Sequence, residues 1–187
     1  MNLMTLNAEI FDVLYDLREH GAEAPFFLEA KLGNLALEWL TNEKYVRRLE
    51  ATPAGTLVLL GPRGRQVCGL SPNYLSPPDI AADQYLRRRC LAALRSRGWT
   101  YKARVKQLKN VLELEHRDGR RAYLFARWKR PSARSVRRVL TVLRGSLVKG
   151  NAVLLVRTDL PHTLRHLSDI SGGKVKSMAS ELYKGAD

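Results

Sequence analysis

The side chains of this sequence that are best suited to chemistry are arginines and lysines, which bind anions. Residues 81–187 hold 25 Lys and Arg against 8 Asp and Glu, a net charge of +17, whereas residues 1–80 hold 7 against 10, a net charge of −3. Seventeen of the 25 cations are arginine, and its planar guanidinium group can donate two parallel hydrogen bonds to a phosphate or to a guanine edge. This excess of one sign predicts a polyanionic partner, and nucleic acid is the first class to consider.

The cations occur in clusters, which we expect to gather over one contiguous face of the C-terminal part of the chain. Some follow a strand-like alternation, as from Lys102 to Lys106, and others, up to Arg144, lie on a predicted helix. Four aromatic residues interleaved with them can stack on bases or pack in a core. They are Trp99, Tyr101, Tyr123 and Trp128. The predicted nucleic-acid-binding residues are Lys44, Arg47, Arg48, Arg87, Arg88, Arg95, Lys102, Arg104, Lys106, Arg120, Arg121, Arg127, Lys129, Arg130, Arg134, Arg137 and Arg138.

Two acidic residues in the basic part of the chain have a spacing that catalysis could use. Glu113 and Glu115 are two residues apart, so on a strand their side chains face the same way. Paired carboxylates can hold a divalent metal, but the surrounding arginines favour ion pairs, and metal binding stays the alternative. Asp118 is expected to belong to a turn. We therefore predict no catalytic residue, no metal and no cofactor.

Other catalytic patterns are missing from the sequence. It contains neither a GxxxxGK[ST] phosphate-binding loop nor a GxSxG nucleophile elbow. His162 and His166 have an i, i+4 spacing, but no Glu follows His162 as it does in the HExxH zinc motif, so surface or capping histidines are expected. Cys68 and Cys90 lack a CxxC spacing and are predicted to be buried apolar residues.

The elements that must position these residues begin with three short helices. Apolar residues recur every three or four positions over residues 3–17, and His20-Gly21 predicts the end of a first helix. A second helix is predicted to follow Pro25 and to end at Gly33. Asn34 is predicted to cap a third helix. The apolar face of that helix would carry Leu35, Trp39, Leu40, Val46 and Leu49.

Two short strands, 48–52 and 56–60, are predicted next, joined by Pro53-Ala54-Gly55 in a hairpin. The run from Leu59 to Val67, with Gly61-Pro62-Arg63-Gly64-Arg65 at its centre, then leads into a short helix. Over residues 3–70 this arrangement resembles bacterial winged-helix domains, although Leu60-Gly61 stands where those domains usually have Leu-Thr. The resemblance implies a domain that contacts DNA, and a protein-binding or dimer-forming role is the alternative.

A proline-rich segment separates this first domain, 1–70, from a second domain, 80–187. Residues 71–79 contain Pro72, Pro77 and Pro78, cannot continue a helix and are predicted to form a linker. The pattern beyond them predicts a helix to about Arg97, strands within 100–108, 111–116 and 121–128, a helix to Gly150 capped by Ser132 or Ser135, a buried strand at 152–157, and a helix at 161–170. An Asp118-Gly119 turn joins the second and third strands. The predicted fold class is α+β or α/β, with an αβββαβα order around a small mixed sheet in the second domain.

This order is similar to the core of the PD-(D/E)xK nuclease-like fold, and a winged helix followed by such a core resembles bacterial replication-relaxation type proteins. That fold implies an Asp on one hairpin strand and a (D/E)-x-K triplet on the next. This sequence reads Lys109-Asn110-Val111 where the first acid would stand, and it has no acid from Tyr123 to Lys129. The resemblance therefore implies a degenerate nuclease-like domain that is not an enzyme.

These observations predict a non-enzymatic protein that binds double-stranded DNA and acts in transcription regulation or in plasmid or phage replication. The alternatives are a metal-dependent endonuclease with a rearranged active site and an RNA-binding module. The apolar runs are far shorter than the ~20 residues of a membrane span, and the N-terminus lacks a secretory signal pattern. We therefore expect a cytoplasmic, nucleoid-associated protein without a membrane partner, and a homodimer stays open.

Overall fold

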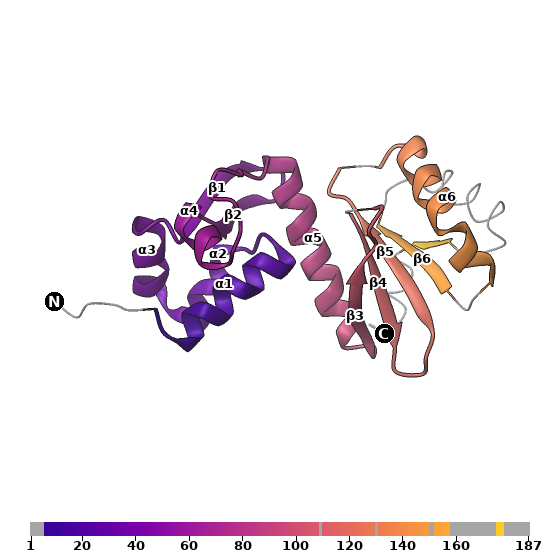
Figure 1. Cartoon of the computed structure of the whole chain (residues 1–187), viewed down its shortest axis with the longest axis horizontal. Helices are drawn as coiled ribbons and strands as arrows, with labels where there is room; N and C mark the ends of the chain where they lie inside the picture. The colour runs from indigo at the N-terminus through magenta and orange to yellow at the C-terminus, as the bar shows by residue number, and fades with distance from the viewer. Residues whose placement is uncertain (1–5, 109, 130, 150–151, 158–174, 178–187) are drawn as a thin grey trace. The chain divides into compact units, whose positions relative to one another are not determined.

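The computed structural model describes residues 6–108, 110–129, 131–149, 152–157 and 175–177. In this part of the chain, helices combine with a two-stranded and a five-stranded sheet in an α+β architecture (Figure 1). The chain divides into two compact units, Met1–Arg88 (unit 1) and Arg89–Asp187 (unit 2). No helix among the described residues has the length and apolar composition that crossing a membrane requires.

Unit 1 begins with three short helices, and local sequence signals set the bounds of the first two. Helix α1 (Ala8–His20) starts where Asn7 Oδ1 accepts a 2.9 Å hydrogen bond from the backbone N–H of Ile10, and it ends at Gly21, whose φ is 83°. Helix α2 (Pro25–Leu32) has proline at its first position and ends at Gly33. Helix α2 and the end of α1 confirm the prediction, because a proline and two glycines act over a single turn. The start of α1 differs from it, since the predicted apolar pattern includes Leu6, which lies before the helix.

The third helix differs from its prediction at both ends. Helix α3 spans Asn34–Asn42, so Gly33 takes the N-cap position, and Asn34 Nδ2 donates a 3.3 Å hydrogen bond to Glu38 Oε1 within the helix. Beyond its end, Lys44 has a φ of 61°, in the left-handed region that breaks a helix. Val46 and Leu49 therefore belong to a strand, and their place in the predicted apolar face was wrong. Val46 keeps a helical spacing in the sequence, yet it enters the core from the strand.

A β-hairpin and a short helix complete the first part of unit 1. Strands β1 (Val46–Thr52) and β2 (Gly55–Leu60) pair antiparallel, with Val46 opposite Leu60. The segment between α1 and α2 adds one bridge to this hairpin, because the backbone groups of Glu23 and Val58 exchange hydrogen bonds of 3.0 and 2.7 Å. Helix α4 (Pro62–Val67) follows directly.

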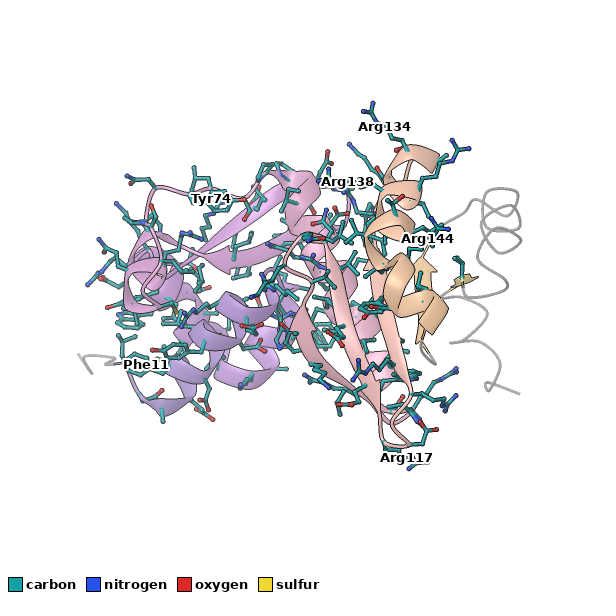
Figure 2. The ribbon with its side chains drawn as sticks, turned by 45° about the vertical axis from the view of Figure 1, so that its right-hand side comes forward. Phe11, Tyr74, Arg117, Arg134, Arg138 and Arg144 are labelled. Atoms are coloured by element: carbon teal, nitrogen blue, oxygen red, sulfur yellow. The ribbon has the colours of Figure 1, made fainter. Side chains whose placement is uncertain are left out.

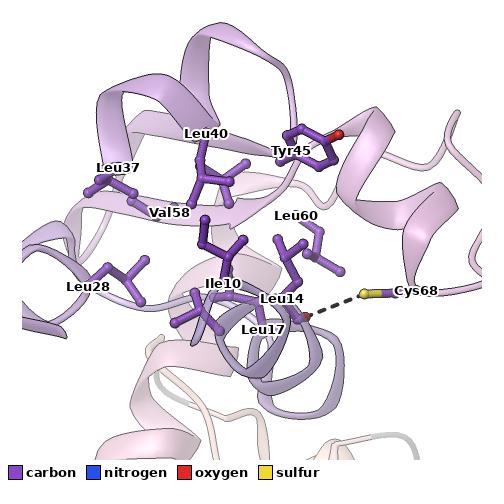
Figure 3. Packing of buried hydrophobic residues seen from close by; sticks show 12 residues of the cluster. Ile10, Leu14, Leu17, Leu28, Leu37, Leu40, Tyr45, Val58, Leu60 and Cys68 are labelled. Carbon is purple, nitrogen blue, oxygen red and sulfur yellow. Dashed lines mark hydrogen bonds between the residues drawn. The ribbon is translucent and has the colours of Figure 1, made fainter. Parts of the chain in front are cut away.

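The helices and the hairpin of unit 1 enclose one hydrophobic core (Figure 3). Leu14, Leu37 and Leu40 are fully buried, and burying such a side chain contributes roughly 1.5–3 kcal/mol. Cys68 lies in the same core, and its Sγ is 3.6 Å from the backbone oxygen of Leu14. Burial raises the pKa of the Cys68 thiol, although Arg18 and Arg65 act in the opposite direction. Cys68 and Cys90 are both buried and form no disulfide, as predicted.

The division between the units falls within helix α5 (Pro78–Arg95) and not in the predicted linker at 71–79. The first part of α5 packs on unit 1, because its Ala81 and Tyr85 lie in one apolar cluster with Leu57 and Leu59 of β2. The predicted linker is also held to unit 1. The guanidinium groups of Arg65 and Arg47 donate hydrogen bonds of 2.5 and 3.2 Å to the carbonyl oxygens of Ser71 and Ser76. Proline stops a helix, but it does not stop a segment from packing.

Unit 2 is built on a mixed five-stranded sheet with the order β3-β4-β5-β6-β7. The strands are β3 (Trp99–Arg104), β4 (Val111–His116), β5 (Arg121–Ala126), β6 (Ala152–Arg157) and β7 (Val175–Ser177). The first three pair antiparallel, whereas β6 is parallel to both β5 and β7. The predicted Asp118-Gly119 turn joins β4 to β5, and Gly119 has a φ of 84°. The predicted helix at 161–170 lies outside the described residues.

Helix α6 (Ala133–Lys149) connects β5 to the parallel strand β6 and covers one face of the sheet. Its residues at three- and four-residue spacing, Val136, Val139, Leu143 and Leu147, are buried with the β5 residues Tyr123 and Phe125. Val111 of β4 lies directly opposite Phe125 and shares this face. Leu112, Leu114 and Leu124, which alternate with them, are buried on the other face.

Candidate nucleic-acid interface

Four arginines line the outer side of α6. Arg134, Arg137, Arg138 and Arg144, here called the α6 cluster, are exposed, whereas Val136, Val139 and Leu143 between them are buried. A helix that packs one apolar stripe against a sheet must direct its remaining positions to solvent, so the predicted separation of the two sets is confirmed. Figure 2 shows Arg134 in the first turn of this helix and Arg144 farther along it. No acidic partner of these four arginines is found among the described residues.

The start of α6 adds to the positive potential of the cluster. Ser132 Oγ accepts a 3.2 Å hydrogen bond from the backbone N–H of Ser135, which makes Ser132 the N-cap and settles the choice between the two serines. The first turn contains no acidic residue. Unpaired backbone N–H groups give a helix N-terminus a partial positive charge, which here lies beside Arg134. An anion is therefore favoured at this end of α6.

A pocket of about 340 Å³ opens beside the first turns of α6. Its lining comes from the β3–β4 loop, strands β4 and β5, the β5–α6 loop and α6. The lining residues are Gln107, Leu108, Asn110, Val111, Phe125, Arg127, Ser135, Arg138 and Val139. Arg127 and Arg138 belong to the predicted set, whereas Gln107 and Asn110 were not predicted. Uncharged amides in a loop carry no sequence signal, and only the fold brings them beside two arginines.

The first strands of the sheet place an acid beside one of the predicted cations. The side chains of Thr100, Lys102 and Arg104 are exposed along β3, and Lys102 Nζ lies 3.1 Å from Glu115 Oε2. Glu113 and Glu115 face the same side of β4 as Val111, the side covered by α6. Within the described residues, no group of three or more His, Cys, Asp or Glu side chains could hold a metal ion.

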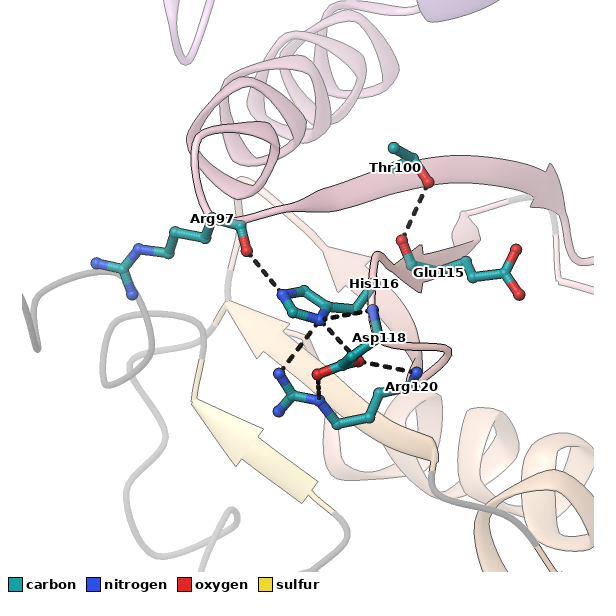
Figure 4. Close-up of polar contacts among 6 residues, drawn as sticks. All are labelled: Arg97, Thr100, Glu115, His116, Asp118 and Arg120. Atoms are coloured by element: carbon teal, nitrogen blue, oxygen red, sulfur yellow. Dashed lines mark hydrogen bonds and ion pairs between the residues drawn. The ribbon is translucent and has the colours of Figure 1, made fainter.

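A polar network organises the turn between β4 and β5 (Figure 4). Asp118 Oδ1 lies 2.7 Å from His116 Nδ1, and Asp118 Oδ2 accepts a 2.7 Å hydrogen bond from Arg120 Nε. His116 Nε2 lies 2.9 Å from the backbone oxygen of Arg97, which ties the turn to the start of β3. The Arg120 guanidinium group also lies 5.8 Å from the ring centre of Trp99. The charge of Arg120 is therefore largely used inside the turn.

The carboxyl group of Asp118 is stabilised in its charged form by this network. Desolvation raises its pKa, but hydrogen bonds from the backbone N–H of Arg120, from His116 and from the Arg120 side chain outweigh that effect and lower the pKa from 3.8 to about 2. Asp118 thus belongs to the turn, as predicted, and remains ionised in the folded protein down to acid pH.

The predicted cations of unit 1 mostly have partners within the unit. Arg48 pairs with Glu29 at 3.3 Å, and Arg88 pairs with Asp16 and, at 3.3 Å, with Glu23. Arg87 is buried, with 8% of its surface exposed. The pKa of Arg47 is lowered by burial and by the charge of Arg65. Of the predicted residues before position 89, Lys44 alone combines an exposed side chain with no ion pair among the described residues.

The exposed side of helix α3 is not basic. Its exposed residues are Asn34, Leu35, Glu38 and Asn42, and Leu35 is 73% exposed. The nearby Arg63 pairs with Glu43 and lies 4.8 Å from the ring centre of Tyr45. The exposed side of α3 therefore carries less positive charge than the outer side of α6.

The cations of unit 2 lie at two ends of the sheet and not over the single face that was expected. Because β5 runs from the turn at Gly119 to the start of α6, these two points are at opposite ends of the strand. Figure 2 shows Arg117 at one end and Arg134 at the other. We call Arg117, Arg120 and Arg121 the hairpin cluster, and all three are exposed. Other exposed predicted cations of unit 2 are Arg95, Arg104, Lys106 and Lys129, and Arg130 lies outside the described residues.

Comparison of the chain with protein-family models, with curated proteins and with solved structures finds no match.

Proposed function

We propose that this protein binds double-stranded DNA without catalysing a reaction, and that the α6 cluster supplies most of its phosphate contacts. The observation that carries the proposal is an exposed helix side with four arginines, without acidic partners among the described residues. Unit 2 as a whole holds 23 Lys and Arg against 7 Asp and Glu, a net charge of +16, so the wider field also favours a polyanion.

The spacing of the cluster supports a duplex as the ligand. Ten residues separate Arg134 from Arg144, which is about 15 Å along a helix axis. Successive phosphates lie about 3.4 Å apart along each DNA strand, so the cluster can reach several of them on one duplex. Arginine contacts to phosphate fix orientation and add affinity, but they do not read sequence.

Unit 1 is proposed to be a winged helix that adds little electrostatic affinity. Three helices, the β1–β2 hairpin and the bridge between Glu23 and Val58 support this assignment. The exposed residues of α3, with Glu38 and no cation, argue for a contact with protein or for base readout by Asn42. The resemblance to replication-relaxation type proteins would then place the protein at the nucleoid, in transcription or replication control, and leaves dimer formation to be tested.

Neither alternative function is favoured by a specific contact. An endonuclease would need Glu113 and Glu115 to hold a metal, but Glu115 is paired with Lys102. An RNA-binding module would use the same cations, so a competition between duplex DNA, single-stranded DNA and structured RNA separates the two ligands.

The salt dependence of duplex binding tests the proposal. We expect about 5–10 phosphate contacts, and therefore a slope of roughly −4 to −9 when the logarithm of the binding constant is plotted against that of salt concentration. Fluorescence anisotropy with a labelled random-sequence duplex measures this slope. An affinity that hardly changes with salt would contradict the proposal.

Neutralising the α6 cluster shows where the contacts are. Changing Arg134, Arg137, Arg138 and Arg144 to Gln should reduce the magnitude of the slope by roughly 3 to 4, since each lost phosphate contact contributes about 0.9. The control changes Arg48 and Arg63 to Gln. These two arginines are paired with Glu29 and Glu43, so the slope should stay nearly unchanged. An equal change of slope per neutralised arginine in the two variants would assign the binding to net charge alone.

A further inference from the structure

We infer that the pocket beside α6 binds one unpaired nucleotide, with its base inside the pocket and its phosphate at the arginines. This inference rests on the proposed function, because it names the part of a nucleic acid that this site would hold. The pocket has a volume of about 340 Å³, within the lower part of the roughly 300–1,000 Å³ range of small-molecule sites. That volume suits a single nucleotide and not a longer segment.

The floor of the pocket is apolar because the fold places a cross-strand pair there. Val111 of β4 and Phe125 of β5 lie directly opposite each other on the sheet face that α6 covers. Val139 of α6 and Leu108 of the β3–β4 loop extend the apolar surface, and all four side chains are buried in the protein. An apolar floor offers nothing to a bare phosphate ion, but it can receive the faces of a nucleobase.

The rim of the pocket combines two arginines with uncharged hydrogen-bonding groups. Arg127 and Arg138 line it, together with the side chains of Gln107, Asn110 and Ser135, and no acid is present in this lining. Arginine suits bidentate contact with phosphate, and amide side chains carry both a donor and an acceptor for the edge of a base. The charge of the lining therefore selects an anion, and its amides suit a base.

The backbone holds these groups in place. In the β3–β4 loop, the N–H of Val105 donates to the carbonyl of Val111 at 3.1 Å, and the N–H of Val111 donates to Leu108 at 2.8 Å. On α6, Ser135, Arg138 and Val139 are spaced i, i+3 and i+4, so one side of the helix forms the wall. Figure 2 shows Arg138 on this helix. Arg137, one residue earlier, does not line the pocket.

Calorimetric titration of the full chain with the four deoxynucleoside monophosphates and with inorganic phosphate tests the inference. At least one nucleotide should bind about tenfold or more tightly than phosphate, because only the nucleotide can use the apolar floor. Arg138→Ala should weaken that nucleotide by about tenfold or more, the scale of a charge-assisted hydrogen bond, whereas Arg137→Ala should change it by less than about threefold. Asn110→Ala should weaken it and alter the preference among bases.

Three results would overturn the inference: no nucleotide binding, equal affinity for nucleotides and phosphate, or equal losses from Arg138→Ala and Arg137→Ala. Duplex titrations of the same variants separate this outcome from the proposed function. Arg138→Ala and Arg137→Ala should each reduce the magnitude of the duplex salt slope by about 1, and Asn110→Ala should leave it unchanged. If nucleotides fail to bind while the wild-type duplex slope stays within roughly −4 to −9, the pocket assignment fails and duplex binding stands. If nucleotides bind but the affinity for the duplex does not change with salt concentration, the pocket assignment stands and the proposal of duplex binding is wrong.

Discussion

Arginine side chains have different roles in units 1 and 2. In unit 1, Arg48, Arg63 and Arg88 each pair with an acid, and Arg65 binds the Ser71 carbonyl and lies 5.0 Å from the ring centre of Tyr74. In unit 2, the four arginines of α6 are exposed without an acid nearby among the described residues. The difference shows that the number of cations does not define a binding surface. What matters is whether the fold supplies an internal partner.

The largest expected effect contrasts two glycines that lie on helices of the two units. A Cβ on Gly64 of α4 would lie 2.0 Å from the backbone oxygen of Tyr45, whereas a Cβ on Gly145 of α6 would meet nothing within 4 Å. Gly64→Ala should lower the free energy of unfolding of unit 1 by about 3 kcal/mol or more, because backbone atoms must move. Gly145→Ala should raise that of unit 2 by about 0.5–1 kcal/mol.

Chemical denaturation of both glycine variants, with hydrogen exchange to assign each transition to a unit, measures these changes. Gly145→Ala serves as the matched control, since it adds the same methyl group to a helix. Equal and small effects would show that α4 is not packed tightly against the segment that joins α3 to β1.

The next effect contrasts two arginines of helix α5. Arg88 pairs with Asp16 and Glu23, and one of its nitrogens donates a 3.1 Å hydrogen bond to the carbonyl of Gly21. Arg88→Ala should lower the free energy of unfolding of unit 1 by about 2–3 kcal/mol, because the buried Glu23 carboxylate then loses an ion-pair partner. The same change should leave the duplex salt slope unaltered, since this guanidinium group is paired with acids of unit 1 and does not contact phosphate.

Arg95 provides the control on the same helix. It is exposed, and Arg95→Ala should change stability by less than about 0.5 kcal/mol. Thermal unfolding and duplex binding of the two variants are measured side by side. A reduced salt slope in Arg88→Ala with normal stability would reverse the assignment of Arg88 to an internal role.

The smallest effect concerns the turn between β4 and β5. The pKa of Asp118 is lowered from 3.8 to about 2 in the folded protein, so its contribution to stability is fully present above pH 4 and is lost as the pH falls from about 4 to about 2. Wild type should be slightly more stable than Asp118→Asn at neutral pH, and the two should converge near pH 2. Urea titrations at several pH values measure the difference. A difference that persists unchanged at pH 2 would contradict this assignment of charge.

Most elements of the fold could be predicted where a local signal marks them. Gly21, Pro25 and Gly33 act within one helical turn, and the Asp118-Gly119 pair sets its hairpin by its own backbone preference. The α6 stripe was predictable because its buried positions repeat along a single helix. The end of α3 was not, since Val46 fits a helical spacing and its strand exists only through pairing with Leu60.

The candidate site was predicted only in part. The charge excess and the arginines of α6 are visible in the sequence, but the sequence does not reveal which cations have partners. In the sequence, Arg88 is one member of a basic run. The acids that it pairs with, Glu23 and Asp16, precede it by 65 and 72 positions. Long-range pairs of this kind depend on the packing of α5 against unit 1, for which the sequence carries no local mark.

By itself, the sequence determined where most helices and strands begin, the apolar stripe of α6 and the excess of positive charge in the second half of the chain. These features depend on backbone preferences and on periodicity, which act over a few residues. The tertiary structure decided that Arg88 is internal, that the basic residues of unit 2 divide between two ends of the sheet, and that Gln107, Asn110 and Arg138 line one pocket. Those outcomes depend on strand pairing and helix packing between distant segments, and such contacts exist only in the folded chain.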